Sequence, residues 1–454
     1  MRSCVRLLAA TACCLLIASS PAAFARDMPE ASPAREGLSA ARLDRLTRYM
    51  NQAVEDGVMV GGVGMIARNG RVVYQETYGL ADREPQRPMR KDTIFRIYSM
   101  SKPITSVAVL MLYEEGKFFL NDPVARYLPQ LANLEVAVST ADGGDTRMIS
   151  DGTTSRTEGT GDASQAGKTR KPRRQPTIRD LLTHTAGFTY GLFGDTEVDR
   201  LYRQAELLTT DMPLMEFVTR LGKLPLQYDP GTRWHYSVSV DVQGALVEAV
   251  SGMPFGEFLE QRLFQPLGMV DTGFVVPEDK LDRFAELYSP AGTPSDAAEA
   301  FQTASASNEL VEADEEFDEG FRPGAKFQSG GGGLVSTAPD YLRFAQMLLN
   351  GGELDGVRIL SPKTVELMTT NHLGDIPMWD PGVGFGLGVA VALDQGQIGE
   401  LGSVGEYNWG GAAGTRFWID PEEELIGVFM VQSIPHRTRL GSAFKTLTYQ
   451  AIVE

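Results

Sequence analysis

The chain has 454 residues and 42 lysines and arginines against 59 aspartates and glutamates, so its formal net charge is −17. This acid excess argues against nucleic acid or an anionic lipid surface as a partner. The three cysteines, Cys4, Cys13 and Cys14, lie at the extreme N-terminus, which excludes a disulfide framework or a cysteine-based metal site elsewhere. The four histidines are far apart and form no His-Glu-x-x-His motif, so we expect neither a metal nor a cofactor.

The N-terminus has the features of a secretory signal peptide. Two arginines precede an apolar run over residues 7–20, which is too short for a transmembrane helix, and small residues at Ala23 and Ala25 suit a signal peptidase. We therefore expect a signal peptide over residues 1–25 and a periplasmic or secreted mature chain. Lipid modification of Cys13 is a weaker alternative. No later stretch reaches about eighteen apolar residues, so stable membrane insertion is not expected.

The first third of the chain predicts a helix, a hairpin and a buried helix. Residues 39–56 carry apolar side chains at helical spacing. Residues 61–67 and 71–79 are apolar runs joined by Asn69-Gly70, the strongest short hairpin signal. Residues 99–117 form a nearly all-apolar run, which predicts a helix that is buried on most sides.

The rest of the chain predicts mainly helices, followed by strands. Residues 131–176 are polar and predict a long surface loop or hairpin, and the acidic residues 297–320 predict another loop. Helical spacing recurs over residues 214–221, 240–251, 255–264, 339–349 and 440–452. Strand patterns return over residues 386–393, 415–419 and 425–432.

Strands at both ends of the chain with helices between them predict an α+β fold. We expect an antiparallel sheet that is flanked by helices and carries a largely helical inserted subdomain. One domain would then span residues 26–454. Its sheet part would cover about residues 26–98 and 351–454, and its helical part about residues 99–350.

The motif Ser-x-x-Lys occurs twice, and its context separates the two copies. Ser442 and Lys445 lie in the final helix, which we expect to be exposed, so we assign that copy no chemistry. Ser99 and Lys102 lie where the buried helix begins, because Pro103 is compatible only with a first helical turn.

The position of Ser99 at a helix start has three chemical consequences. Residues three apart share a helix face, so the Lys102 amine can reach the Ser99 hydroxyl. Apolar neighbours such as Ile104 would desolvate Lys102 and lower its pKa, which favours a neutral base. The Ser99 N–H is unpaired at the helix start and can bind an oxyanion. A serine cap beside a surface lysine is the alternative, which this segment alone leaves open.

Two further segments carry candidate site residues. Tyr236 precedes a helix, and its hydroxyl could pass a proton between a nucleophile and a leaving group. The run Trp409-Gly410-Gly411-Ala412 leads into a strand, and its glycines would let the backbone approach a ligand closely. A backbone N–H of this run could supply a second oxyanion donor.

These segments, in this order and spacing, resemble the serine β-lactamase and penicillin-binding-protein superfamily, and most closely its class C-like branch with the family VIII carboxylesterases. The resemblance implies that Ser99 is the acylated serine, Lys102 the motif lysine and Tyr236 the tyrosine of the Tyr-x-Asn motif. It also implies that Trp409, Gly410 and Gly411 replace the Lys-Thr-Gly motif, and that the N–H groups of Ala412 and Ser99 form the oxyanion hole. Further matching segments are residues 181–187, 266–269 and 332–337.

Two departures from the lactamase pattern bear on the substrate. Val238 stands where lactamases carry asparagine, and Trp409 stands where they carry a lysine that helps to bind a carboxylate. We therefore predict a serine esterase that cleaves short-chain esters. The alternatives are a weak β-lactamase or D-alanyl-D-alanine-type peptidase, and a non-catalytic binder of cell-wall-like ligands. The expected partner is a small-molecule ester or lactam. His184 and His235 are expected to be structural, and the sequence indicates no oligomeric state.

Overall fold

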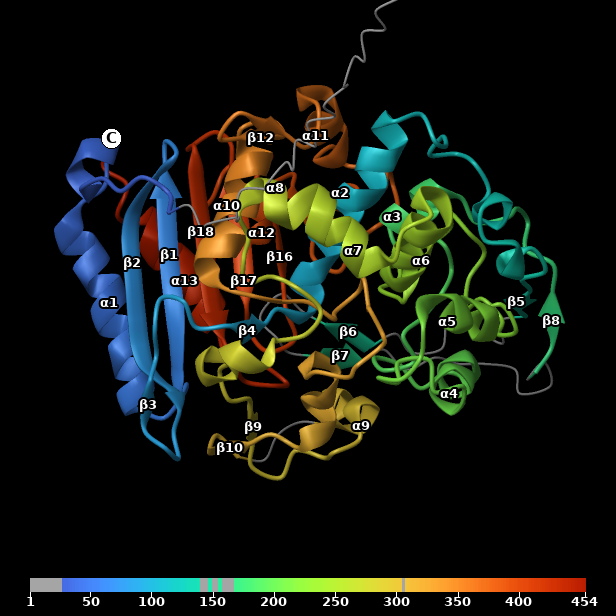
Figure 1. Cartoon of the computed structure of the whole chain (residues 1–454), viewed down its shortest axis with the longest axis horizontal. Coiled ribbons are helices and arrows are strands. Elements are labelled where there is room, and N and C mark those ends of the chain that lie inside the picture. Colours follow the sequence, from blue (N-terminus) through green and yellow to red (C-terminus); the bar gives the residue numbers. More distant parts are fainter. Residues whose placement is uncertain (1–26, 139–145, 149–153, 157–166, 304–306) are drawn as a thin grey trace, which may run out of the picture.

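The computed structural model describes residues 27–138, 146–148, 154–156, 167–303 and 307–454, so the predicted signal peptide lies outside the described residues. An eight-stranded antiparallel sheet lies in the left half of Figure 1 and has the strand order β14-β15-β16-β17-β18-β1-β2-β3. The N-terminal strands are β1 (Gly61–Arg68), β2 (Arg71–Asp82) and β3 (Arg87–Pro88). The C-terminal strands are β14 (Val383–Phe385), β15 (Ala390–Ala392), β16 (Tyr407–Gly410), β17 (Arg416–Asp420) and β18 (Leu425–Val431).

The two ends of the chain meet in the middle of this sheet. Strands β1 and β18 pair in antiparallel register from Gly62 opposite Val431 to Arg68 opposite Leu425. The turn between β1 and β2 has positive φ at both Asn69 and Gly70, as a two-residue hairpin requires. The predicted α+β fold with an antiparallel sheet is confirmed.

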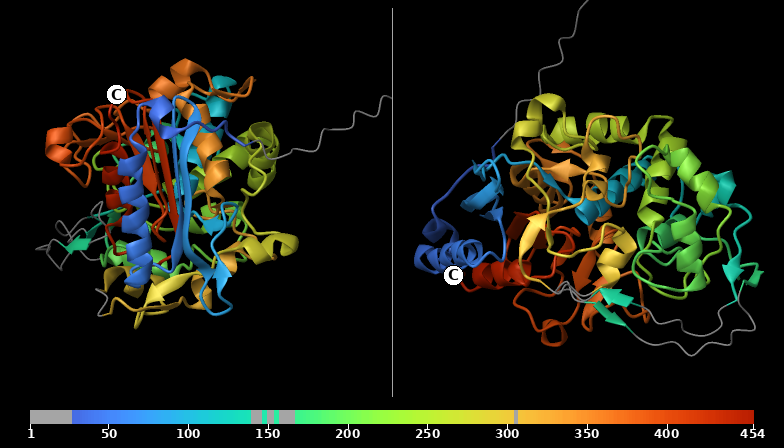
Figure 2. Two further views of the ribbon diagram at one scale, coloured as in Figure 1. Left: turned by 90° about the vertical axis from the view of Figure 1, so that its left-hand side faces the viewer. Right: turned by 90° about the horizontal axis from the view of Figure 1, so that it is seen from below.

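Helices cover both faces of the sheet (Figure 2). Helices α1 (Ala40–Glu55) and α13 (Leu440–Tyr449) pack together on one face, against β2 and β18 respectively. Helix α10 (Ala338–Leu349) packs on β1, β17 and β18 from the other face. The helices predicted for these three segments are present.

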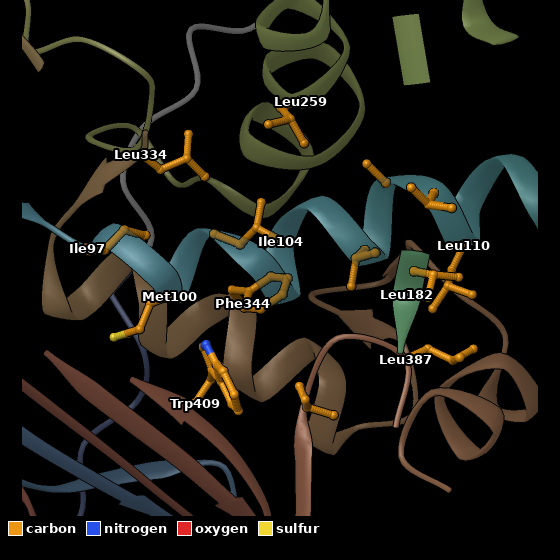
Figure 3. Packing of buried hydrophobic residues seen from close by; sticks show 14 of the residues in the cluster. Ile97, Met100, Ile104, Leu110, Leu182, Leu259, Leu334, Phe344, Leu387 and Trp409 are labelled. Atoms are coloured by element: carbon orange, nitrogen blue, oxygen red, sulfur yellow. The ribbon is translucent and has the colours of Figure 1, made fainter. Parts of the chain in front are cut away.

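Helix α2 (Ser101–Glu114) runs through the core between the sheet and the remaining helices. Figure 3 shows Ile97, Met100 and Ile104, at and before its first turn, packed with Phe344 of α10 and with Leu334. This packing on several sides holds the start of α2 in a fixed place. The remaining helices are α3 (Ile178–Leu182), α4 (Glu197–Gln204), α5 (Leu214–Leu221), α6 (Ser239–Ser251), α7 (Phe255–Leu259), α8 (Gln265–Leu267), α9 (Ala297–Gln302), α11 (Pro362–Met368) and α12 (Gln395–Ile398).

Two sequence predictions are wrong in detail, and both concern short strands. Residues 386–393 do not form one strand, because a turn with Gly388 in a positive-φ conformation separates β14 from β15. Residues 297–320 are not only a loop: they contain α9 and β10 (Leu310–Glu312), which pairs with β9 (Tyr288–Pro290). The polar sequence lacks a strand pattern, and this pairing comes from the tertiary contact.

The other short strands lie outside the large sheet, as β4 (Phe95–Arg96), β5 (Val136–Ala137), β6 (Thr146–Met148), β7 (Thr154–Arg156), β8 (Thr169–Arg170), β11 (Val335–Ser336), β12 (Glu353–Leu354) and β13 (Val357–Arg358). The pairs β5–β8 and β6–β7 lie in the segment predicted as a loop or hairpin. Within the described ranges, no helix is long and apolar enough to cross a membrane.

Candidate active site

Ser99 lies in a short 3-10 turn, Tyr98–Met100, that joins strand β4 to helix α2. Lys102 follows in the first turn of α2, and its Nζ lies 3.1 Å from the Ser99 Oγ. The i, i+3 spacing therefore places the amine next to the hydroxyl, as the sequence predicts.

The residue before Ser99 is held in an unusual backbone conformation. Tyr98 has φ of 41°, in the left-handed region that side chains other than glycine rarely adopt. Its ring packs edge-to-face on Phe321 at 5.3 Å, and its hydroxyl donates to the Phe317 carbonyl at 3.1 Å. These contacts offset a conformational cost of about 1–3 kcal/mol. No local sequence signal indicated this turn.

Tyr236 approaches Ser99 from the segment before α6. Its hydroxyl donates a hydrogen bond to the Ser99 Oγ at 2.6 Å. The ring packs against His184 at 4.9 Å, Tyr190 at 5.3 Å and Trp409 at 5.7 Å. The structure thus brings Ser99, Lys102 and Tyr236 together around one oxygen atom, and aromatic packing fixes the tyrosine ring.

Lys102 is almost fully buried, with 1% of its surface exposed. Burial lowers the pKa of its amine to about 7, while the nearby Asp241 carboxylate opposes this shift. The Nζ also donates to the Gly331 carbonyl at 2.5 Å. Near neutral pH a large fraction of Lys102 is therefore neutral and able to accept a proton.

Asp241 and the glycine-rich turn behind Lys102 were missed as parts of the site. Asp241, on the fully buried first turn of α6, accepts hydrogen bonds from the Ser329 hydroxyl at 2.5 Å and the Gly331 N–H at 3.1 Å. Gly331 thus contacts Asp241 through its N–H and Lys102 through its carbonyl. From the sequence, residues 332–337 were only a segment that matches the family, without a role in the site. The signal that could have indicated Asp241 is a carboxylate among the apolar residues of a helix that the sequence predicts to be buried.

The loop after β16 lies against the backbone that leads into Ser99. A Cβ at Gly411 would lie 2.4 Å from the Ile97 carbonyl, so only glycine allows this approach. The Thr415 hydroxyl donates to the same carbonyl at 3.3 Å. Gly411 and Ala412 therefore line the same pocket as Ser99. Among the described residues, no acceptor bonds the Ala412 N–H, which leaves it available to a ligand.

A pocket of about 460 Å³ opens at Ser99. Near Tyr236 its walls are mainly apolar, and they include Phe193, Phe301, Trp379 and Trp409. Trp409 packs against Trp379 with ring centroids 6.0 Å apart and against Phe385 at 5.4 Å. Trp409 thus lies in an aromatic wall of the pocket.

The remaining candidates of the sequence analysis have structural surroundings. His184 is buried against the Tyr236 and Trp234 rings, and burial holds its pKa well below the usual range. Val238 is fully buried. The final helix was expected to be exposed, and this expectation is wrong at Lys445, because only 4% of the surface of that residue is exposed. Its amine forms an ion pair with Glu406 at 2.7 Å, which keeps it from acting as a free base.

A family model described as Beta-lactamase matches residues 46–439, so the chain belongs to the Beta-lactamase family. Esterase EstB of Burkholderia gladioli is 33% identical over 395 residues, which cover 86% of this chain and 90% of that protein. Lovastatin esterase of Penicillium rubens is 28% identical over 412 residues, which cover 84% and 91% respectively.

Solved structures share the fold. The structure of EstCE1, described as a hydrolase with promiscuous acyltransferase activity, has a TM-score of 0.69 and 27% identity, and covers 90% of this chain and 98% of that one. The predicted superfamily and the predicted class of serine hydrolase are confirmed.

Proposed function

We propose that the protein is a serine esterase that hydrolyses short-chain carboxylic esters through an acyl-enzyme on Ser99. The observation that carries this proposal is the Ser99 Oγ, which lies within hydrogen-bond distance of both a buried lysine amine and a tyrosine hydroxyl. The names of EstB and lovastatin esterase, both esterases, support the ester chemistry.

Acylation begins when Lys102 in its neutral form accepts the Ser99 hydroxyl proton. The Ser99 Oγ attacks the ester carbonyl carbon, and the carbonyl π electrons move to the oxygen. The N–H groups of Ser99 and Ala412 stabilise this oxyanion, and preorganised donors of this kind lower such barriers by about 3–4 kcal/mol each.

Collapse of the intermediate breaks the bond to the alcohol oxygen. Tyr236 donates its proton to this leaving oxygen and regains one from Lys102. Burial raises the pKa of the Tyr236 hydroxyl, so it stays protonated before this step. Water then attacks the acyl-enzyme by the reverse proton path, which releases the acid and restores Ser99.

Carboxylates of the protein already pair with two of the three arginines and lysines that line the described pocket, which weakens the attraction for a β-lactam carboxylate. Of the cations in its described lining, Arg416 pairs with Glu400 at 3.3 Å and Lys445 with Glu406 at 2.7 Å. The Arg437 guanidinium donates to two backbone carbonyls. Carbonyls do not neutralise a guanidinium, so among the described lining residues a β-lactam carboxylate would find only Arg437 without an acidic partner.

Two measurements test this function. A fluorophosphonate probe should label the wild type at Ser99 and fail to label Ser99→Ala, as shown by peptide mass spectrometry. The kcat/KM for p-nitrophenyl butyrate should greatly exceed that for nitrocefin. Fast nitrocefin turnover without esterase activity would favour the β-lactamase alternative, and an absence of labelling would favour the non-catalytic binder.

We also propose that the protein is exported, with a signal peptide over residues 1–25. Support comes from the sequence alone, through its two early arginines, its apolar run and its small residues at the expected cleavage site.

A further inference from the structure

The pocket continues well beyond the aromatic wall at Ser99. Its far part is lined by polar and charged side chains from the segment between α12 and β16, from β16 and β17 and from α13. We call this part the polar end, and it consists of Glu400, Glu406, Asn408, Arg416, Ser442 and Lys445. The proposed chemistry at Ser99 uses none of these side chains.

Gly410 connects the two parts of the pocket. Successive residues of a strand face opposite sides, so Trp409 lies on one side of the sheet with Tyr236, and Gly410 on the other. Gly410 stands directly opposite Arg416 in the β16–β17 pairing, so these two residues share a face. A Cβ on Gly410 would meet only the Thr415 carbonyl oxygen, at 3.3 Å, so the pocket is open at this residue, with Ala412 and Arg416 also in its lining.

The polar end is electrically balanced. Arg416 pairs with Glu400 at 3.3 Å, and its other nitrogen donates to the Ser442 hydroxyl at 3.1 Å. Behind them, Lys445 lies 2.7 Å from Glu406 and 3.7 Å from Glu400. Two cations therefore meet two carboxylates, with no net charge.

The two ion pairs differ in their access to a ligand. The side chains of Lys445 and Glu406 are 5% and 1% exposed, so this pair forms the floor. The side chains of Arg416 and Glu400 are 15% and 23% exposed, and they face the pocket with Ser442. A ligand therefore meets a guanidinium donor, a carboxylate acceptor and the Ser442 hydroxyl, which accepts from Arg416 and also hydrogen-bonds to Glu400.

We propose that the polar end binds an uncharged group with several hydroxyls, such as a sugar or polyol, that forms one half of the ester substrate. This inference rests on the proposed esterase function and specifies its substrate class. A carboxylate in this place would meet Glu400, and an ammonium would meet Arg416, whereas hydroxyls can satisfy both groups. The volume of about 460 Å³ also suits a ligand larger than a C2–C4 ester alone.

The test compares esters that differ in one half only. Ethyl butyrate is the reference, a methyl glucoside monobutyrate carries hydroxyls in the alcohol, and ethyl gluconate carries them in the acyl group. Butyrylcholine and 2-butyryloxypropanoate add a cation and an anion to the alcohol. We expect kcat/KM of the wild type for at least one hydroxylated ester to exceed that for ethyl butyrate by about tenfold or more, as two or more hydrogen bonds would give. Neither charged ester should share this gain.

Ser442→Ala removes one hydroxyl of the polar end without a change in charge. It should lower the ratio of kcat/KM for the preferred hydroxylated ester to that for ethyl butyrate by about three- to tenfold. Ser39→Ala is the matched control, because the Ser39 hydroxyl makes no capping bond on α1 and lies outside the pocket. The Tm of both variants shows whether they fold.

Three other outcomes would contradict the proposed polyol site. Equal kcat/KM for all neutral esters, or a preference for a charged ester, would overturn the polar end as a polyol site while leaving the esterase intact. An unchanged ratio in a folded Ser442→Ala would do the same. If no ester were hydrolysed, the proposed function would fail together with this inference.

Discussion

Replacing Asp241 by asparagine should move the acidic limb of the pH–activity profile to lower pH. In the proposed mechanism the neutral amine of Lys102 is the active form, and burial lowers its pKa to about 7. In the wild type, kcat/KM should therefore rise with pH, reach half its plateau near pH 7 and stay level above. The Asp241 carboxylate stabilises the ammonium form, so its removal lowers the Lys102 pKa further.

The structure sets the size of this shift. Gly331 bridges the two groups, with contacts of 2.5 Å to the Lys102 amine and 3.1 Å to the Asp241 carboxylate. For two unit charges with one peptide group between them, an effective dielectric constant of about 20 gives an interaction of about 2 kcal/mol, or one to two pH units. Burial also raises the pKa of Asp241, which reduces its charge in acid. We therefore expect a shift of about one pH unit.

The assay is kcat/KM for p-nitrophenyl butyrate from pH 5 to pH 9. At pH 6 the wild type should retain about a tenth of its plateau activity and Asp241→Asn about a half. The asparagine Oδ1 can keep both hydrogen bonds that Asp241 accepts, so the fold should persist.

Asp340→Asn is the control for this experiment, because burial raises the pKa of Asp340 to about 7 as well. The acidic limb of the pH–activity profile of Asp340→Asn should stay at the wild-type pH. A limb that moves in Asp340→Asn but not in Asp241→Asn would refute the assignment of the limb to Lys102.

The other predictions concern the proposed catalytic residues, the substrate and export. Ser99→Ala should lose at least about 10³-fold in kcat with an unchanged Tm, and full activity would exclude Ser99 as the nucleophile. Lys102→Arg should be nearly inactive because a guanidinium stays protonated, and wild-type rates would exclude a base role. Tyr236→Phe should lose much activity in the same assay while keeping its fold by circular dichroism. Trp409→Lys should narrow the gap in kcat/KM between a C2–C4 ester and benzylpenicillin by about ten- to a hundredfold, with a lower Tm, and an unchanged gap would contradict the charge argument. N-terminal sequencing of exported protein should give Arg26, and an uncleaved start would contradict the signal peptide.

The sequence by itself was sufficient where neighbouring residues decide the geometry. Asn69-Gly70 predicts the hairpin because its residues tolerate positive φ, and the structure has that turn. The spacing of Ser99 and Lys102 predicts a contact because residues three apart share a helix face, and the two side chains lie 3.1 Å apart. The resemblance placed Tyr236 in the same site, which local reasoning alone left as one possible proton carrier.

Features that depend on contacts between distant segments could be seen only in the tertiary structure. Tyr98 has positive φ, and its side chain contacts Phe317 and Phe321, more than two hundred residues along the chain. Lys445 belongs to a helix that looked exposed, yet Glu406 from another loop buries and pairs its amine. Sequence periodicity reports which face of an element is apolar, but not which element will cover it. The polar end is an example, because its carboxylates come from the segment between α12 and β16 and its cations from β17 and α13. No single segment of the sequence predicts that they meet.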